Sequence, residues 1–263
     1  MVKVEDKFYV QSVNRTLEII QKISEANTHG LSITEISKAI DLPVSTVYRL
    51  IQNLLAWNYV YEKEDGHYTL GLRLLELGSI VQQNVQVRNI AKKYMEELNR
   101  ITKETIYMAV LDEKANNLIY VEKLDSKRNV NLVAGVGTRN YIHSTANGKC
   151  VVSAFSDEKI IQILSKTGMP KLTDHTITDV NKFLEEVHKV REQGYAVDDL
   201  ENESSVRCVA APIYDYRNSV VASISISGVS TYIDHGKMFG EYKDLVIEAA
   251  ENISKELGYK KLN

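Results

Sequence analysis

Cysteine is scarce in this chain of 263 residues, which contains only Cys150 and Cys208. Two cysteines are too few for the disulfide framework of a small secreted domain, so the sequence predicts a protein of the reducing cytoplasm. No apolar run approaches the ~20 residues that a membrane-spanning helix needs. The start, MVKVEDKFYV, has neither the basic nor the apolar block of a signal peptide. These absences argue against a secreted protein and against a membrane protein.

Proline is also scarce, with three residues, and no low-complexity linker is visible between domains. A net positive charge is missing as well: residues 1–72 hold seven basic and nine acidic side chains. A protein that binds DNA without regard to sequence would be basic. The charge therefore argues against a non-specific DNA-binding protein. The length leaves room for one small module and one domain of ordinary size.

Residues 33–51, ITEISKAIDLPVSTVYRLI, have the pattern of two short helices joined by a tight turn. Their apolar residues recur at the spacing by which two crossed helices share one core. Ser32 and Glu35 form a capping-box pattern, and Pro43 fits the first turn of the second helix. That helix, expected over residues 43–58, would present hydroxyl, amide and guanidinium groups, which can hydrogen-bond to bases and phosphates in a major groove. The alternative is a helical hairpin that only packs.

A β-hairpin is expected directly after these helices. Residues 57–61 and 67–70 are rich in aromatic and aliphatic residues, and the turn between them ends in Asp65-Gly66. With a first helix over residues 13–23, this order predicts a winged helix-turn-helix. The expected DNA contacts are Ser45, Thr46, Tyr48, Arg49 and Gln52 on the second helix, with Arg15, Lys63 and His67 reaching the DNA backbone.

The rest of the chain predicts a helical joint followed by a sheet flanked by helices. Residues 72–87 carry a broad apolar stripe at near-helical spacing, which must be buried on its own domain or on a second copy. From residue 105 onward, β-rich segments alternate with amphipathic ones, which predicts an antiparallel sheet in an α+β fold. The expected strands are 106–111, 117–121, 130–133, 195–197, 207–213 and 220–227, and the expected helices are 87–102, 147–155, 157–167, 179–193 and 238–257.

Two segments of this second part carry candidate site residues. Ser223, Ser225 and Ser227 alternate with aliphatic residues, so one face of their strand is entirely hydroxyl. This face is either wet or the floor of a polar pocket. The stretch HSTANGKC at 143–150 is a small-residue turn that leads into a helix, whose first N–H groups can bind an anion such as a carboxylate.

Several separated motifs in this order resemble those of the IclR-type bacterial transcriptional regulators over essentially the whole chain. The matching segments are the helix-turn-helix at 33–51, the wing ending in Tyr68-Thr69-Leu70-Gly71, HSTANGK at 143–149, GYAVDDLENESSVRCVAAPI at 194–213 and SISISG at 223–228. The resemblance implies a winged helix-turn-helix domain over residues 1–72, a linker and dimerisation helix over 73–90, and a GAF-like effector-binding domain with a central antiparallel sheet over 91–263. The chain differs from the family pattern at Asn147, which adds an amide, and at Leu200, where an acid is common.

The resemblance also implies an effector pocket. Carried over position by position, its lining is expected to include Leu132, Ala146, Asn147, Asp198, Val206, Cys208, Ser225 and Ser227. The predicted function is a sequence-specific regulator that represses a catabolic operon and is controlled by a small organic acid, either a sugar acid or an aromatic acid. Its expected partners are double-stranded operator DNA, the effector, and further copies of itself in a homodimer or a dimer of dimers. No membrane, cofactor, metal or enzymatic activity is expected.

Two other classes of protein remain open at this stage. One is an enzyme, or a metal or redox sensor, with a DNA-binding appendage. It would use a triad of His143, Asp198 and Cys208, or metal ligands from His143, Cys150, Cys208 and His175. For the cysteines, the default interpretation is a buried structural role. The other class is an oligomeric scaffold that binds no ligand.

Overall fold

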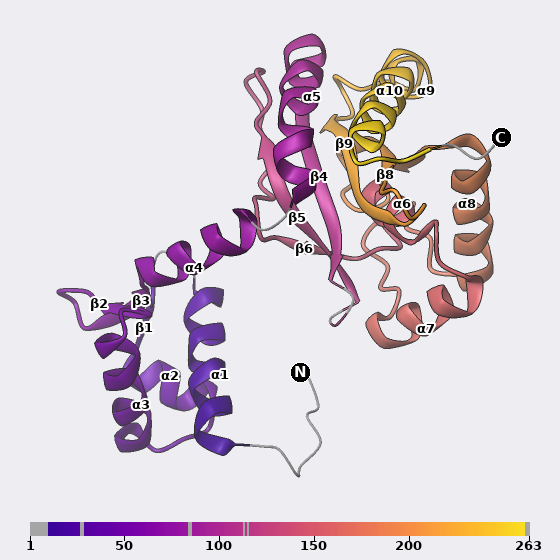
Figure 1. The fold of residues 1–263 in the computed structure, drawn as a ribbon. Coiled ribbons are helices and arrows are strands. Elements are labelled where there is room, and N and C mark those ends of the chain that lie inside the picture. Colours follow the sequence, from indigo (N-terminus) through magenta and orange to yellow (C-terminus); the bar gives the residue numbers. More distant parts are fainter. Residues whose placement is uncertain (1–9, 27–28, 84–85, 113, 115, 261–263) are drawn as a thin grey trace. The chain divides into compact units, whose positions relative to one another are not determined.

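The computed structural model describes residues 10–26, 29–83, 86–112, 114 and 116–260. Contacts between residues divide the chain into two compact units, Met1–Asn84 and Val85–Asn263. None of the helices in this described part of the chain is long and apolar enough to span a membrane. Figure 1 shows the elements of each unit.

The first unit is a winged helix, as the sequence predicts. It contains the helices α1 (Gln11–Glu25), α2 (Ile33–Ala39) and α3 (Val44–Ala56) and the strands β1 (Leu31–Ser32), β2 (Val60–Glu62) and β3 (His67–Leu70). The strands form an antiparallel sheet in the order β1-β3-β2. Apolar side chains of all three helices and of the wing form one core, made of Ile19, Ile23, Ile36, Val47, Ile51, Leu54, Val60 and Tyr68.

Local signals set the ends of these helices. The Ser32 backbone N–H donates to Glu35 Oε2 at 2.8 Å, while the Ser32 side chain accepts from the Glu35 backbone, which confirms the capping box. Pro43 is the residue that precedes α3. The β-run expected from residue 57 was too long, because Trp57 is the C-cap of α3 and Asn58 and Tyr59 lie in the turn that follows. Asn58 has φ +57°, which turns the chain away from the helix axis before β2 starts.

The predicted joint is divided between two helices. Helix α4 (Leu72–Gln83) follows the wing, and α5 (Gln86–Thr102) belongs to the second unit. On α4, large apolar side chains are exposed: Leu72 is 62%, Leu75 66% and Ile80 55% accessible. On α5, by contrast, Val87, Met95 and Leu98 are buried in the second unit. The apolar stripe of the sequence therefore has one uncovered part and one part packed on its own domain.

The second unit is built on a six-stranded antiparallel sheet, as predicted. Its strands are β4 (Thr105–Asp112), β5 (Asn117–Leu124), β6 (Arg139–Asn140), β7 (Ala196–Asp199), β8 (Val206–Tyr214) and β9 (Val220–Val229), in the order β6-β5-β4-β9-β8-β7. Strands β4 and β9 pair in the middle, with Tyr107 opposite Ser225. This pairing places the serine strand at the centre of the sheet, away from its edges.

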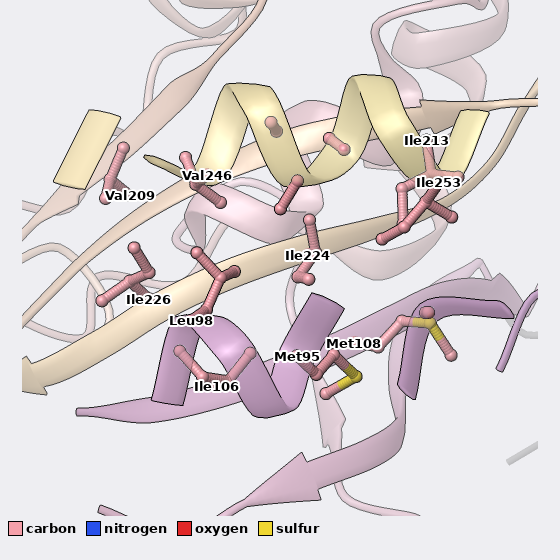
Figure 2. Close-up of a cluster of buried hydrophobic side chains, with 14 of the residues drawn as sticks. Met95, Leu98, Ile106, Met108, Val209, Ile213, Ile224, Ile226, Val246 and Ile253 are labelled. Atoms are coloured by element: carbon pink, nitrogen blue, oxygen red, sulfur yellow. The ribbon is translucent and has the colours of Figure 1, made fainter. Parts of the chain in front are cut away.

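Each face of this sheet is covered by helices. Ile106 and Met108 of β4 and Ile224 and Ile226 of β9 point toward α5 and α10 (Glu241–Glu256), where they form the larger core with α9 (His235–Phe239) (Figure 2). The alternate residues of the strands point to the opposite face, which is covered by α6 (Ala146–Val152), α7 (Asp157–Thr167) and α8 (Val180–Gln193). Because both faces are covered, the hydroxyl face of β9 cannot be a solvent surface.

Two expectations about this unit were wrong. Residues 130–133 are not a strand but part of an irregular loop between β5 and β6. Its carbonyl groups are satisfied by side chains: Lys123 Nζ donates to Leu132 O at 2.7 Å, and the Tyr107 hydroxyl donates to Ala134 O at 2.8 Å. The last helix is also split, because Gly240 separates α9 from α10 with φ −106° and ψ −112°, outside the helical region.

Candidate functional site

Helix α3 separates apolar and polar side chains as a DNA-reading helix does. Val47, Ile51 and Leu54 are buried in the core of the winged helix. The opposite side carries the predicted contacts: Ser45, Tyr48, Arg49 and Gln52 are exposed, and Thr46 is half-buried. No acidic residue lies on α3 to repel phosphate groups.

Of the three contacts predicted outside α3, two are less accessible. Arg15 on α1 and His67 on β3 are half-buried. The His67 ring lies 3.2 Å from Asp65 Oδ1 and 3.7 Å from Glu35 Oε2, so it is surrounded by carboxylates. Lys63 in the turn of the wing is exposed, and its Nζ lies 3.5 Å from the carbonyl oxygen of His29. Arg49 and its neighbours on α3 are therefore the better candidates.

In the second unit, a small cavity lies between the sheet, the start of α6 and the loop after β7. Seven of the eight predicted effector residues line it: Leu132, Ala146, Asn147, Asp198, Val206, Cys208 and Ser227. Its volume of about 20 Å³ is close to that of one water molecule. An organic acid is larger, so its entry requires the lining to move apart. The loop of Leu132 and Ala134, held by two side-chain hydrogen bonds, is one of the irregular parts of this lining, together with the loop after β7.

The eighth residue, Ser225, lies behind the lining. Asn147 Nδ2 donates to Ser225 Oγ at 2.8 Å, and Asn147 Oδ1 accepts from Ser223 Oγ at 2.8 Å. Ser225 Oγ is also 3.1 Å from Ser227 Oγ, and all three serines are buried. Of these three serines, Ser227 lines the cavity itself, whereas Ser223 and Ser225 bind the Asn147 amide, which lines it.

The turn before α6 has its compact form because of two small residues. Thr145 caps the helix, since its hydroxyl accepts a hydrogen bond from the Gly148 backbone at 3.1 Å. A side chain at Gly148 would collide with the backbone of Ile142, so only glycine allows this close approach. The turn therefore brings Ala146 and Asn147 against the cavity.

Three ionisable side chains lie beside the cavity: Lys149 on α6, Asp198 on β7 and Glu201 in the loop after β7. Lys149 Nζ donates to Glu201 Oε1 at 2.5 Å and to the carbonyl of Val197 at 2.8 Å, and this ion pair is buried. Asp198 Oδ1 accepts hydrogen bonds from the backbone N–H groups of Glu201 at 2.7 Å and Asn202 at 3.2 Å. Burial and the neighbouring Glu201 carboxylate raise the pKa of Asp198 to about 8.

Sequence reasoning missed the other residues of the lining. They are Tyr107, Tyr120, Ala134, Asn140, Thr145, Asn202 and Glu203. The rings of Tyr107 and Tyr120 stack with their centres 4.2 Å apart and form an aromatic wall. Alternation along β4 assigns Tyr107 to the face opposite Ile106, but only the pairing of β4 with β9 brings it to the serine strand.

The structure brings only part of the alternative triad together, because Asp198 and Cys208 lie opposite each other on β7 and β8 while His143 lies apart from them. His143 is not among the lining residues: it is buried, with Nε2 3.1 Å from the carbonyl oxygen of Pro170. Cys208 does line the cavity, but burial raises the pKa of its thiol, which disfavours the thiolate of a nucleophile. Within the described ranges, no three His, Cys, Asp or Glu side chains are grouped so that they could hold a metal ion.

A winged helix with an exposed polar helix α3 defines the class of DNA-binding transcriptional regulators. Residues 12–64 match the IclR helix-turn-helix domain, and residues 80–255 match the bacterial transcriptional regulator IclR C-terminal domain. The chain therefore belongs to the IclR family, and it is a DNA-binding transcriptional regulator. It is 37% identical to the HTH-type transcriptional regulator KdgR of Escherichia coli over 251 residues, which cover 95% of this chain and 94% of that one.

Solved structures agree with this assignment. The crystal structure of the Thermotoga maritima IclR is 31% identical, with a TM-score of 0.78 over 95% of this chain and 100% of that chain. An IclR homolog from Microbacterium hydrocarbonoxydans, solved in complex with 4-hydroxybenzoate, is 22% identical. Its TM-score is 0.79 over 94% of this chain and 99% of that chain, and it shares the fold.

Proposed function

We propose that this regulator is a repressor whose winged helix reads an operator and whose C-terminal cavity binds a small organic acid. The cavity carries the proposal, because it brings residues from α6, from the loop after β7 and from strand β9 together around one small space. Among the relatives, the HTH-type transcriptional repressor AllR of Escherichia coli is 32% identical over 95% of this chain, which supports repression. The regulator would act in the cytoplasm, where its operator lies.

The effector class is supported by the lining. Hydroxyl, amide and thiol groups face a space with an aromatic wall, and such polar groups can orient a small polar ligand. The Microbacterium homolog was solved with 4-hydroxybenzoate, an aromatic carboxylic acid. Aromatic acids and sugar acids are therefore the first candidates here. Catalysis is not part of the proposal, because the relatives are transcriptional regulators and the Cys208 thiol is held neutral by burial.

The exposed face of α4 supports dimerisation. Leu72, Leu75 and Ile80 are exposed on this helix, and large apolar side chains so grouped typically mark an interaction site. We propose that the linker region, residues 73–90, pairs with a second copy and places two DNA-binding domains, residues 1–72, on a repeated half-site. Binding of the acid to the effector-binding domain, residues 91–263, would then shift the conformational equilibrium of this dimer. A dimer of dimers extends the same arrangement.

The test starts from DNA, because the operator can be found without knowing the effector. Selection from random double-stranded DNA with the full chain should enrich a sequence with two half-sites about one helical turn apart. Binding to that sequence is then measured with sugar acids and aromatic acids present. One acid should weaken or strengthen binding, and Asp198→Ala should abolish this response while leaving DNA affinity unchanged.

Each part of the proposal can fail separately. If no sequence is enriched, α3 does not read an operator. If a sequence is enriched but no acid changes its binding or the melting temperature of the chain, the effector class is wrong. If Asp198→Ala still responds to the acid as the wild type does, the pocket lies elsewhere.

A further inference from the structure

The charge of the cavity does not match an anionic ligand. Two of the residues that line it are acids, Asp198 and Glu203, and none of the lining residues is a lysine, arginine or histidine. The buried cation beside it, Lys149, already pairs with Glu201. A carboxylate placed next to an ionised Asp198 would be repelled strongly, because buried charges are poorly screened.

The hydrogen bonds of Asp198 leave one oxygen for a ligand. Both backbone N–H groups that bind this carboxyl group, those of Glu201 and Asn202, bind to Oδ1. Within the described residues, no hydrogen bond is formed to Oδ2. A proton on Oδ2 would turn Asp198 into a donor without disturbing the two bonds at Oδ1.

Other titratable groups surround Asp198 from every neighbouring element. Cys208 faces it from β8, Tyr107 from β4 and Tyr120 from β5; Lys149 reaches the same loop from α6, and Glu201 and Glu203 belong to that loop. Burial raises the pKa of the thiol and of both phenols, so these groups stay neutral.

Between the two buried acids, the proton belongs on Asp198. Burial raises the pKa of Glu201 as well, but the Lys149 ammonium donates directly to Glu201 Oε1 and so favours its ionised form over that of Asp198, which has no such partner. That charge and the burial of Asp198 together hold the pKa of Asp198 at about 8. At neutral pH, Asp198 is therefore mostly protonated.

We propose that the effector carboxylate accepts a hydrogen bond from protonated Asp198 Oδ2, so that ligand binding is coupled to retention of a proton. This rests on the proposed function, since it assumes an organic-acid effector. The bond replaces the missing cation: O–H···O⁻ bonds are short and strong in a buried site. When Asp198 is ionised, binding must take up one proton from solution, because the two carboxylates cannot share the cavity without one.

The affinity for the acid should therefore depend on pH in a defined direction and by a defined amount. Below the pKa of Asp198, the proton is already present and the affinity is constant. Above about pH 8, the affinity falls, by roughly tenfold for one pH unit. The acid itself stays ionised throughout this range, so its own titration does not contribute.

Titration calorimetry on the full chain tests this coupling. Acetate, pyruvate, gluconate and benzoate serve as probes at about pH 6.5 and about pH 9, in buffers of different ionisation enthalpy. An acid that binds should bind roughly tenfold more weakly at the higher pH and take up close to one proton there. Asp198→Asn, which keeps a neutral donor, should bind with equal affinity at both pH values. Asp174→Asn, the same change at an exposed position outside the cavity, is the matched control and should keep the wild-type pH dependence.

The outcomes separate this inference from the function on which it rests. Binding of an acid with equal affinity at both pH values and without proton uptake overturns the proton coupling alone. Weak binding by Asp198→Asn at both pH values also overturns it, because an ionised Asp198 would then be the acceptor for a ligand hydroxyl. Failure of every acid to bind overturns the effector class itself, and the inference with it.

Discussion

Asn147 donates a hydrogen bond of 2.8 Å to the hydroxyl of Ser225, 78 residues later in the chain. The other end of the same amide accepts from Ser223 Oγ, also at 2.8 Å. Both bonds are buried, and Asn147 lines the cavity while Ser225 does not. Ser223 and Ser225 of β9 therefore hold the Asn147 side chain of the pocket in one orientation. Ser227, on the same strand face, lines the cavity itself.

Replacing Ser225 by alanine tests this role. In Ser225→Ala, the Asn147 amide loses its acceptor in a buried place, which should lower the free energy of unfolding by about 1–3 kcal/mol. The response to the effector should weaken, because Asn147 is no longer held in one orientation, while DNA affinity should not change. Urea unfolding followed by circular dichroism gives the first quantity. Ser165→Ala on the exposed side of α7 is the control, with a change within about 0.5 kcal/mol; equal stability of both variants would contradict the argument.

Arg49 offers the clearest test of the DNA-binding helix. It is exposed on α3, and its guanidinium group can form two hydrogen bonds to a guanine or to a phosphate. Arg49→Ala should weaken binding to the selected operator by about 1–3 kcal/mol, or roughly five- to 150-fold. Arg49→Lys keeps the positive charge but loses the planar, two-pronged donor group. Compared with Arg49→Ala, it should therefore restore binding to DNA of any sequence, but restore less of the preference for the operator. Operator binding of Arg49→Ala at wild-type strength would remove α3 from the interface.

Much of the fold could be predicted from the sequence because its signals are local. The capping box at Ser32 and the turn at Asp65-Gly66 fix their elements through neighbouring residues alone. The loop at 130–133 could not be predicted in this way. Its residues have the apolar composition of a strand, but its backbone is held by Lys123 and by Tyr107, which is distant in the chain.

The site was only partly predictable for the same reason. The family resemblance indicated seven residues that do line the cavity. Tyr107 and Tyr120 were missed because their place depends on which strands pair, and pairing across a sheet leaves no local pattern. The resemblance also places Ser225 in the lining, but Ser225 is not among the lining residues and instead accepts a hydrogen bond from Asn147, which is.

The buried ion pair of Lys149 and Glu201 predicts a strongly non-additive pair of variants. Lys149 is 1% exposed, so Lys149→Met leaves the Glu201 carboxylate buried without its partner. The free energy of unfolding should fall by about 3–5 kcal/mol. The double variant Lys149→Met with Glu201→Leu removes both charges and should recover most of this loss. Urea unfolding of the two variants measures both free energies of unfolding. Equal destabilisation of both would mean that the loss comes from lost packing and not from the unpaired Glu201 carboxylate.

The exposed apolar face of α4 predicts a change of assembly. Leu75→Glu places a charge at a position that is 66% exposed in one chain, so the folding of that chain should be unaffected. If α4 pairs with a second copy, the charge would be buried there and the dimer should dissociate. Sedimentation velocity measures the mass of the particle, with Glu76→Gln as the control on the next residue. A dimer of wild-type stability in Leu75→Glu would place the interface elsewhere.

The raised pKa of Asp198 also predicts how stability depends on pH without any ligand. The folded chain keeps a proton on Asp198 up to about pH 8, whereas the unfolded chain loses it near its ordinary value of 3.8. Between these values the folded state binds more protons, so this residue lowers stability as the pH rises. The asparagine of Asp198→Asn does not titrate. The melting temperature of this variant minus that of the wild type should therefore increase steadily from about pH 4 to about pH 8 and stay constant above that. Asp174→Asn, at an exposed position, should differ from the wild type by a constant amount above about pH 5. A difference for Asp198→Asn that stays constant over the same range would show that Asp198 is ionised in the folded chain, and it would remove the donor on which proton-coupled binding depends.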